Sequence, residues 1–444
     1  MTTIKTWLAQ VRREPDAYLI ALLVFLLPFE HIPSIDIRGV TIRPSMIVAV
    51  LVIARAGWLW WRQRPRQSLA RAIWPLLAFL AWLILLIPGS LNHTRAIQVV
   101  TFTAFTIAVA LAVARLFQRS YLPLITKALL ASALIVCLFG LYQYFGNLAG
   151  IGNALTGLRE RYSWQVFGFP RIQSTALEPL YFAAFLLLPL AVLMGLTLAG
   201  VRRKFGLTIM FLAGVCLFLT VSRGGTLAFG VLVPVSAVLA WLLKPEQMRL
   251  KRFGQIALVA LLAYAGALLM ISQLGKPIGL GPKKHNAIQS YKRQLRKTGL
   301  EGTGDERAHS REQALQLFKL HPLLGVGPGN FGPYVQHNQK PATGWSIVNN
   351  ESLELLAETG LVGFGLFGAF VGRLLLGAYL AARQTRELLV RAWLIGLMGF
   401  LVAIAVQYQT FSTLYIMHIW LAIGLLLGLI QTQPEPQARL DDGS

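Results

Sequence analysis

The sequence predicts an all-α polytopic membrane protein with about twelve transmembrane helices and a large external loop late in the chain. Three observations carry this prediction. The 444 residues are 55% hydrophobic and only 13% charged, which excludes an ordinary soluble domain. Apolar runs of roughly 20 residues, the length that crosses a bilayer, follow one another along the chain. Clusters of Lys and Arg mark every second gap between these runs.

The first apolar run could be mistaken for a signal peptide. Pro28 and Phe29-Glu30-His31 follow it in place of a small-residue cleavage site, so we interpret it as a span. The predicted spans are 17–30, 44–61, 72–89, 96–116, 121–145, 177–200, 205–221, 224–243, 254–273, 355–382, 388–410 and 413–431.

The basic gaps predict the orientation, because loops on the cytoplasmic side retain Lys and Arg. The segment before the first span carries Lys5, Arg12 and Arg13. If this segment is cytoplasmic, the gap after each even-numbered span should also be cytoplasmic and therefore basic. Each of these gaps is basic. These gaps hold Arg62, Arg64, Arg66, Arg71, Arg115, Arg119, Arg202, Arg203, Lys204, Lys244, Arg249, Lys251, Arg252, Arg383, Arg386 and Arg391. Both termini are therefore predicted to be cytoplasmic. Much of the net charge of +23 is this orienting signal, which favours contact with anionic membrane lipids, and no nucleic-acid motif accompanies it.

The spans divide the chain into an N-terminal membrane domain at 1–273, an external loop subdomain at 274–351, C-terminal membrane helices at 352–431 and a cytoplasmic tail at 432–444. Within the loop, a helix is predicted from Glu306 to Leu320, because proline at 322 disfavours helix at the residue before it. The glycine-rich stretch 323–331 is predicted to lie against the membrane surface of the protein.

Three external arginines lie among aromatic residues at 146–176, namely Arg159, Arg161 and Arg171. They are either interfacial anchors that reach lipid headgroups or ligands for a bound anion. Arg223 lies close to membrane depth, where an arginine is costly and normally faces a partner or a pathway. The two glycines after it allow backbone amides to approach an anion.

His337 follows the glycine-rich turn, and histidine exchanges protons near neutral pH, so His337 is a candidate base. Asn338 beside it and Arg311 in the predicted helix are candidate substrate-binding residues. The external segments hold no HExxH motif, CxxC motif or apparent carboxylate cluster, which argues against a tightly held metal. The glycines at 325, 327 and 329 lack a surrounding βαβ unit, so no nucleotide site is predicted.

Three strings resemble one known family: Ser-Arg-Gly-Gly at 222–225, His-Pro-Leu-Leu-Gly-Val-Gly-Pro-Gly-Asn-Phe at 321–331, and Asn-Glu-Ser-Leu-Glu-Leu-Leu-Ala-Glu-Thr-Gly-Leu-Val-Gly at 350–363. With the layout of spans, they resemble the O-antigen ligase and O-antigen polymerase superfamily. The specific part covers roughly 300–365, and the rest matches in layout.

The resemblance implies a bacterial inner-membrane enzyme with a fold like that of C-type membrane glycosyltransferases. A ligase of this kind moves polysaccharide from undecaprenyl pyrophosphate to lipid A-core on the periplasmic side, with inversion and without nucleotide, metal or other cofactor. Arginines 161, 171 and 223 would then bind the pyrophosphate, and His337 would be the base.

One departure from the family concerns the base. Many members carry His-Asn where this chain has Asn349-Asn350, so the family histidine does not transfer to that position. Both asparagines are predicted to bind substrate, with helix capping as the alternative for Asn350. The basic run 283–297 is either a solvated amphipathic helix or a docking face for the phosphates of lipid A and inner core.

Two other functions stay open. A polymerase would use the same donor and a lipid-linked acceptor. A transporter of lipid-linked glycans should place charges along a path through the spans, but Glu178, Arg55 and Arg373 each lie near a span end. The ligase hypothesis further requires that Arg161, Arg171, Arg223 and His337, which lie on separate loops, converge in space.

Overall fold

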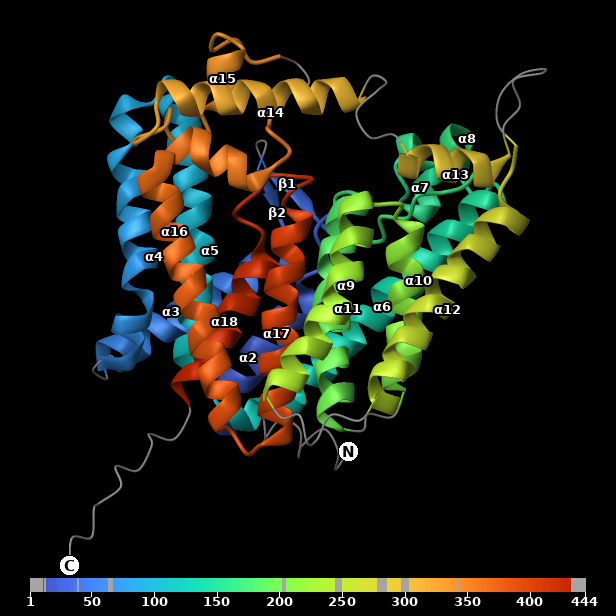
Figure 1. Ribbon diagram of the computed structural model, residues 1–444, viewed down its shortest axis with the longest axis horizontal. Coiled ribbons are helices and arrows are strands. Elements are labelled where there is room, and N and C mark those ends of the chain that lie inside the picture. Colours follow the sequence, from blue (N-terminus) through green and yellow to red (C-terminus); the bar gives the residue numbers. More distant parts are fainter. Residues whose placement is uncertain are drawn as a thin grey trace, which may run out of the picture.

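The computed structural model describes residues 11, 13–37, 40–62, 67–201, 205–243, 250–277, 286–296, 303–341 and 344–432. Most of these residues form helices that run between two ends of a bundle (Figure 1). Eight helices in the described part are long and apolar enough to cross a membrane. They are α3 (Pro44–Arg62), α5 (His93–Leu116), α6 (Leu122–Leu148), α9 (Pro179–Ala199), α11 (Arg223–Leu243), α12 (Leu250–Leu274), α16 (Glu351–Gln384) and α17 (Leu388–Gln407).

Four shorter apolar helices occupy the remaining predicted span positions. They are α2 (Pro15–Leu26), α10 (Gly206–Leu219), α18 (Met417–Gln431) and the apolar stretch Ile73–Gly89, which covers most of α4 (Gln67–Leu85). The mainly helical, polytopic class is thus confirmed, while the number of crossings stays a prediction. The sequence did not predict the small antiparallel hairpin of β1 (Ile35–Ile37) and β2 (Val40–Ile42), in which Ile35 lies opposite Ile42.

The two ends of the bundle differ in what they carry. One end, the loop end, gathers residues 86–92, 149–178, 220–222, 275–277, 286–296, 303–341, 344–350 and 408–416. In Figure 1, α14 (Thr303–Leu320) crosses the bundle at this end, which also carries α13 (Ala287–Arg296), α7 (Asn153–Thr156) and α8 (Trp164–Phe167). Described arginines of the opposite end include Arg62, Arg119 and Arg383.

Several sequence predictions fall outside the described residues or side chains. They concern the side chains of Arg64, Arg66, Arg71, Arg202, Arg203, Lys204, Lys244 and Arg249, the basic residues Lys283, Lys284 and Lys297, and the tail from 433 onward.

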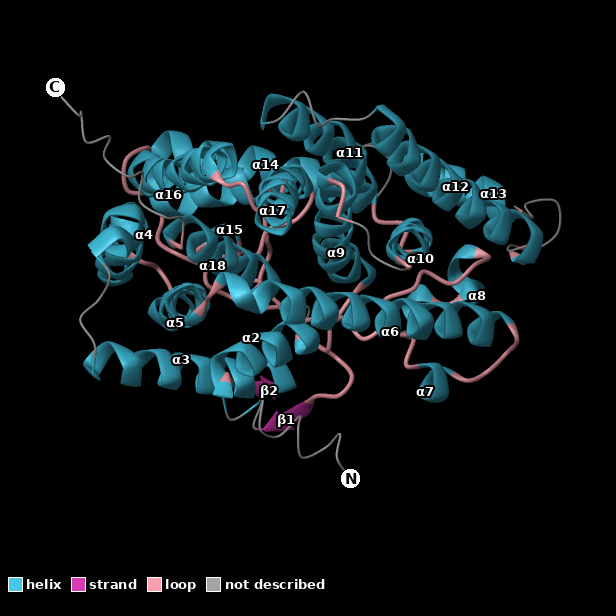
Figure 2. Ribbon diagram, turned by 90° about the horizontal axis from the view of Figure 1, so that it is seen from below, coloured by secondary structure: helices cyan, strands magenta, loops and turns pink. Residues whose placement is uncertain are grey.

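The core of the bundle depends on close helix packing through small residues. Figure 2 shows α9 beside α17, and a Cβ added to Gly195 of α9 would lie only 2.1 Å from the carbonyl oxygen of Ala392. In the other direction, a Cβ on Gly396 of α17 would lie 2.8 Å from the carbonyl oxygen of Ala191. Glycine at such positions lets helix backbones approach closely. This contact lies near the end of α9 and the start of α17. At the loop end, the side chain of Gln407 donates to the carbonyl of Leu180 at 3.3 Å, which holds the start of α9 beside the end of α17.

The long loop returns onto α16. Helix α14 ends at Leu320, as the His321-Pro322 pair predicts, although it begins three residues before the predicted Glu306. Helix α16 is kinked at Gly360, which has φ 65° and ψ −170°. A Cβ there would lie 2.2 Å from the carbonyl oxygen of Leu323. The glycine-rich segment 323–331 therefore packs over the kink, and the amide of Val326 donates to the carbonyl of Ala357 at 2.9 Å.

Candidate active site

A buried glutamine in α6 organises the loop that carries three candidate arginines. The side-chain oxygen of Gln143 accepts from the amides of Gln173 (3.3 Å) and Ser174 (2.7 Å). Its side-chain nitrogen donates to the carbonyls of Thr156 and Ser174, each at 3.1 Å. These four bonds tie together the two sides of the segment that holds Arg159, Arg161 and Arg171. Sequence reasoning missed Gln143 because it lies inside a predicted span.

Tyr162 separates two of these arginines. The Arg161 guanidinium lies 4.9 Å from the ring centroid of Tyr162, and that of Arg171 lies 5.6 Å from it. Arg161 also donates from Nη2 to Oε1 of Glu178 at 2.7 Å, while Nη1 of Arg159 lies 4.0 Å from the same oxygen. Arg159 and Arg161 thus share one carboxylate. Burial raises the pKa of the Tyr162 hydroxyl, as does the charge of Glu178, while the nearby arginines oppose this rise.

Arg171 turns away from Glu178 toward the start of α11. Its Nε donates to the carbonyl of Thr220 at 3.2 Å, and its Nη2 to that of Val221 at 3.5 Å. Arg223 follows two residues later as the first residue of α11. Gly224 is required there, since an added Cβ would lie 1.9 Å from Oγ1 of Thr410. The 408–416 segment therefore lies directly against the start of α11.

Helix α14 brings two more arginines to this place. Burial lowers the pKa of the Arg171 guanidinium, and the positive charges of Arg223 and Arg307 lower it further, against the opposing effects of Tyr162 and Glu178. Burial likewise lowers the pKa of Arg307, with added repulsion from Arg223 and Arg311. We call Arg171, Arg223, Arg307 and Arg311 the arginine cluster. Its members come from three separate segments. Arg307 was missed because an arginine on a polar helix is normally solvated.

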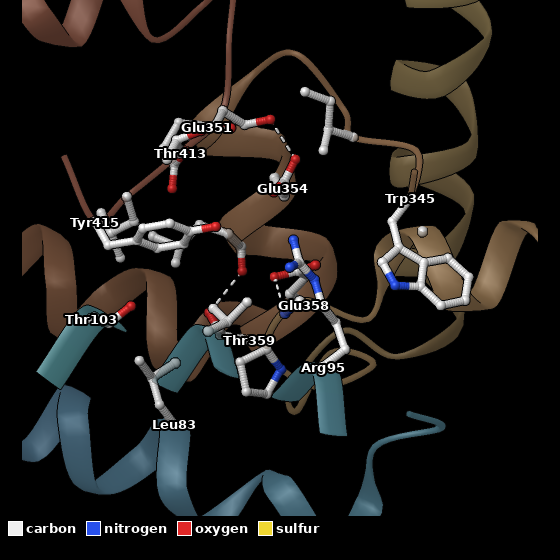
Figure 3. A pocket seen from close by; sticks show the side chains of 18 of the residues that line it. Leu83, Arg95, Thr103, Trp345, Glu351, Glu354, Glu358, Thr359, Thr413 and Tyr415 are labelled. Carbon is white, nitrogen blue, oxygen red and sulfur yellow. Dashed lines mark hydrogen bonds between the residues drawn. The ribbon is translucent and has the colours of Figure 1, made fainter. Parts of the chain in front are cut away.

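A polar cavity of about 250 Å³ lies at the same end of the molecule (Figure 3). Its walls come from α4, α5, the start of α9, the first turns of α16, and the segments 328–332, 345–347 and 412–415. Glu351, Glu354 and Glu358 line it together, because spacings of three and four residues fall on one face of a helix. We call it the carboxylate cavity. In the sequence, these three residues are recognisable only as part of the string at 350–363 that resembles the family.

Two of the three carboxylates hold backbone in place. Glu358 accepts from the amides of Gly329 (2.6 Å) and Phe331 (3.0 Å). Glu354 accepts from the amide of Val348 at 2.9 Å and from the hydroxyl of Ser412. Glu351 accepts from the backbone of Thr413 through one oxygen, while its Oε2 has no hydrogen-bond partner in the described part of the chain. Glu351 thus keeps a buried carboxylate oxygen without a partner among the described residues, while both bonds of Glu354 go to its Oε2.

Comparison with known families identifies the segment that contains most of this site. Residues 208–368 match the family model for O-antigen ligase. Residues 208–368 therefore form a segment similar to O-antigen ligases. The match confirms the resemblance found in the sequence and implies a membrane glycosyltransferase of the ligase or polymerase type that acts on lipid-linked polysaccharide. No curated protein matches the chain.

The O-antigen ligase segment runs from α10 to just past the kink of α16, so it includes Arg223, Arg307, Arg311 and the three glutamates. The loop with Arg159, Arg161 and Arg171 precedes it. Within the described residues, no group of three or more His, Cys, Asp and Glu side chains is arranged to hold a metal ion.

The candidate base lies on a separate turn. His337 is exposed, follows α15 (Phe331–Val335), and has a positive φ of 50°. Its amide bonds to the carbonyl of Tyr334 at 3.3 Å, and the next residue, Asn338, accepts from the side chain of Asn92 at 2.7 Å. The described contacts therefore attach this turn to the start of α5, whereas the arginine cluster lies at α11 and α14.

The two asparagines at the position of the family histidine, Asn349 and Asn350, contact the 408–413 segment, which lies between the arginine cluster and the carboxylate cavity. Asn350 caps α16 by accepting from the amide of Leu353 at 3.1 Å, so the capping alternative is observed. Its side-chain nitrogen donates to Oε1 of Gln409 at 3.0 Å, and Arg311 donates to the carbonyl of the same residue at 2.7 Å. The amide of Asn349 donates to Ser412 at 3.1 Å. The 408–413 segment thus separates the arginine cluster from the carboxylate cavity.

The basic run 283–297 is helical in its described part. In α13, the buried Tyr291 packs edge-on against Phe169, with ring centroids 6.2 Å apart. This contact attaches α13 to the arginine-bearing loop, and docking of lipid A phosphates there stays a prediction.

Proposed function

We propose that this protein is an O-antigen ligase that transfers polysaccharide from undecaprenyl pyrophosphate to lipid A-core in lipopolysaccharide synthesis. In this proposal the protein lies in the bacterial inner membrane, with the loop end in the periplasm and both termini in the cytoplasm. The observation that carries the proposal is the gathering of Arg171, Arg223, Arg307 and Arg311 from three segments. Arg171 bonds to the carbonyl of Val221 just before α11, and Arg311 bonds to the carbonyl of Gln409 in the segment that packs against Gly224.

A pyrophosphate is a fitting ligand for such a cluster. Four like charges repel one another in a partly buried site, and an anion would offset both the repulsion and the lost hydration. Arginine presents a planar set of donors that matches phosphate oxygens. The positive end of the α11 dipole lies beside Arg223 and adds to the attraction. Arg159 and Arg161 would extend the positive surface toward the glycan or the lipid, and Arg311, Asn338, Asn349 and Asn350 would contact substrate around it.

The proposed reaction is a direct displacement. A hydroxyl oxygen of the acceptor sugar bonds to the anomeric carbon of the donor glycan, and the bond from that carbon to the pyrophosphate oxygen breaks with inversion. Negative charge grows on the leaving undecaprenyl pyrophosphate, so preorganised arginines stabilise the transition state more than the ground state. The hydroxyl proton passes to His337, a step that contributes about 10²–10⁴-fold in such reactions. Neither nucleotide nor metal takes part in the proposed step.

The test is transfer of glycan from undecaprenyl pyrophosphate to purified lipid A-core by the full-length protein in nanodiscs with chelator present. His337→Ala should lower the rate by about 10²–10⁴-fold without changing thermal stability. His309→Ala, an exposed histidine on α14, is the matched control and should retain full activity. If the two variants are equally active, His337 is not the base. If the wild type extends lipid-linked repeats but leaves lipid A-core unmodified, the protein is a polymerase.

A further inference from the structure

The carboxylate cavity contains polar atoms that the fold leaves without partners. Glu351 is 7% exposed and Thr103 is fully buried, and both line the cavity. Within the described part of the chain, Oε2 of Glu351, Oγ1 of Thr103 and Nε of Arg95 have no hydrogen-bond partner. Buried polar groups are nearly always paired, with protein, water or ligand. Three such atoms from two helices around one cavity therefore indicate a place for a hydrogen-bonding ligand.

The charges of the cavity indicate which ligand. Three glutamates and one arginine, Arg95, line it, which disfavours a phosphate or another anion. Carboxylate and hydroxyl oxygens instead accept hydrogen bonds from neutral hydroxyl groups. Trp345 and Tyr415 also line the cavity, and aromatic rings supply flat apolar surface for the C–H face of a sugar (Figure 3).

The size of the cavity limits the ligand to one ring. A volume of about 250 Å³ lies below the range of about 300–1,000 Å³ that is usual for drug-sized ligands. It corresponds to roughly eight water molecules at about 30 Å³ each, which is the space for a single hexose and not for a chain of sugars.

The cavity is also adjacent to the arginine cluster. Gln409 accepts from Arg311 on one side and from Asn350 on the other, and Glu351 follows Asn350. We propose that the carboxylate cavity binds one neutral sugar ring of a glycan substrate, with Glu351 accepting hydrogen bonds from its hydroxyls and Thr103 and Arg95 completing the polar contacts. This inference rests on the proposed function. The ring belongs either to the donor polysaccharide or to the acceptor core, which share the same chemistry.

A pair of threonines on α5 offers a matched test. Thr103 and Thr106 are both buried, but Thr103 lines the cavity with an unpaired hydroxyl, whereas the hydroxyl of Thr106 donates to the carbonyl of Thr103 at 3.0 Å. Thr103→Val removes only the unpaired hydroxyl, so the variant should fold at least as well as wild type. Thr106→Val should leave substrate affinity unchanged.

The measurement is equilibrium binding of two separate probes to the full-length protein in nanodiscs: core oligosaccharide released from lipid A-core, and polysaccharide released from its lipid pyrophosphate. Thr103→Val should raise the Kd of one probe roughly 5-fold, and the affected probe identifies the source of the ring. Glu351→Gln converts the unused acceptor into a donor and should raise the same Kd by roughly 10-fold or more.

Equal Kd values for wild type, Thr103→Val and Glu351→Gln with both probes would overturn the inference, as would a wild type that binds neither probe. Parallel transfer assays keep this result distinct from the proposed function. If sugar binding depends on Thr103 but the protein has no transferase activity, the ligase proposal is wrong and the sugar subsite stands. If transfer occurs and is insensitive to Thr103 and Glu351, the sugar subsite is wrong and the ligase proposal stands.

Discussion

The arginine cluster and the carboxylate cavity lie on two sides of the 408–413 segment. They differ in what their charged side chains contact. In the cavity, Glu358 accepts from two backbone amides, one at each oxygen. Glu354 accepts from the amide of Val348 and the hydroxyl of Ser412 at one oxygen, so both carboxylates hold neighbouring segments in place. In the cluster, the hydrogen bonds of Arg171 to described residues go to the backbone carbonyls of Thr220 and Val221, and its charged neighbours are mostly other arginines. The carboxylates Glu354 and Glu358 therefore hold the fold together, whereas the arginines are the groups proposed to bind the donor. Stability should depend on the first kind and activity on the second.

The largest expected effect is on activity, at Arg223. Arg223→Ala should lower kcat/KM for glycan transfer by about 100-fold or more, because removing one preorganised donor at a developing anion costs about 10²–10³-fold. Arg119→Ala is the control, since Arg119 pairs with Glu387 at 2.7 Å at the opposite end of the bundle. The comparison breaks if both variants transfer glycan at the wild-type rate.

The next effect is on stability, at Glu358. Glu358→Gln replaces one acceptor oxygen by an NH₂ group, so the amide of Gly329 or that of Phe331 loses its partner. The free energy of unfolding should fall by about 2 kcal/mol, the cost of one buried unpaired group. Denaturant unfolding of purified protein measures it. The exposed Glu312→Gln on α14 should unfold like wild type, and an equally stable Glu358→Gln would show that the carboxylate does not hold the glycine-rich segment.

A smaller effect is expected at Arg307, which the sequence analysis did not select. Arg307→Ala should raise the inhibition constant of inorganic pyrophosphate roughly 5-fold, because one donor of the cluster is lost. Lys319→Ala removes a positive charge from the same helix near its other end. Equal inhibition constants for the two variants would mean that only the net charge of α14 matters.

The smallest effect is expected at Glu178. Its ion pair with Arg161 is half-exposed, so Glu178→Gln should change stability by less than about 1 kcal/mol. The lost counter-charge should make pyrophosphate inhibit about 2-fold more strongly, and added salt should abolish this gain. Glu160→Gln, exposed in the same loop, is the matched control. A weaker inhibition by pyrophosphate would instead place Glu178 among the ligand-holding groups.

Much of the fold could be predicted from the sequence, because apolar length and helix-breaking residues are local signals. The end of α14 before His321-Pro322 is one example. The small β1–β2 hairpin was missed because its strands are only three residues each. Arg223 could be selected because an arginine near membrane depth is costly, and Arg171 because it lies among aromatic residues in an external segment.

The remaining site residues depend on tertiary packing. Whether Arg307 is solvated or joins the cluster depends on where α14 lies across the bundle. The spacing of Glu351, Glu354 and Glu358 predicts that they share one face of α16. That this face points toward α5 depends on the kink at Gly360. The roles of His337, Asn338 and Asn349 stay predictions, because the structure places them without testing their chemistry.

The hydrogen bonds between the glycine-rich segment and the first turns of α16 have a consequence for chimeric proteins. Glu358 holds the amides of Gly329 and Phe331, and the amide of Leu361 donates to the carbonyl of Pro322 at 2.8 Å. Each segment therefore supplies hydrogen-bond partners to backbone groups of the other. A chimera that takes residues 350–363 from a relative but keeps residues 321–331 of this protein would bring together two segments whose hydrogen bonds and packing do not match. Exchange of glycan preference between two such proteins should succeed only when both segments move together.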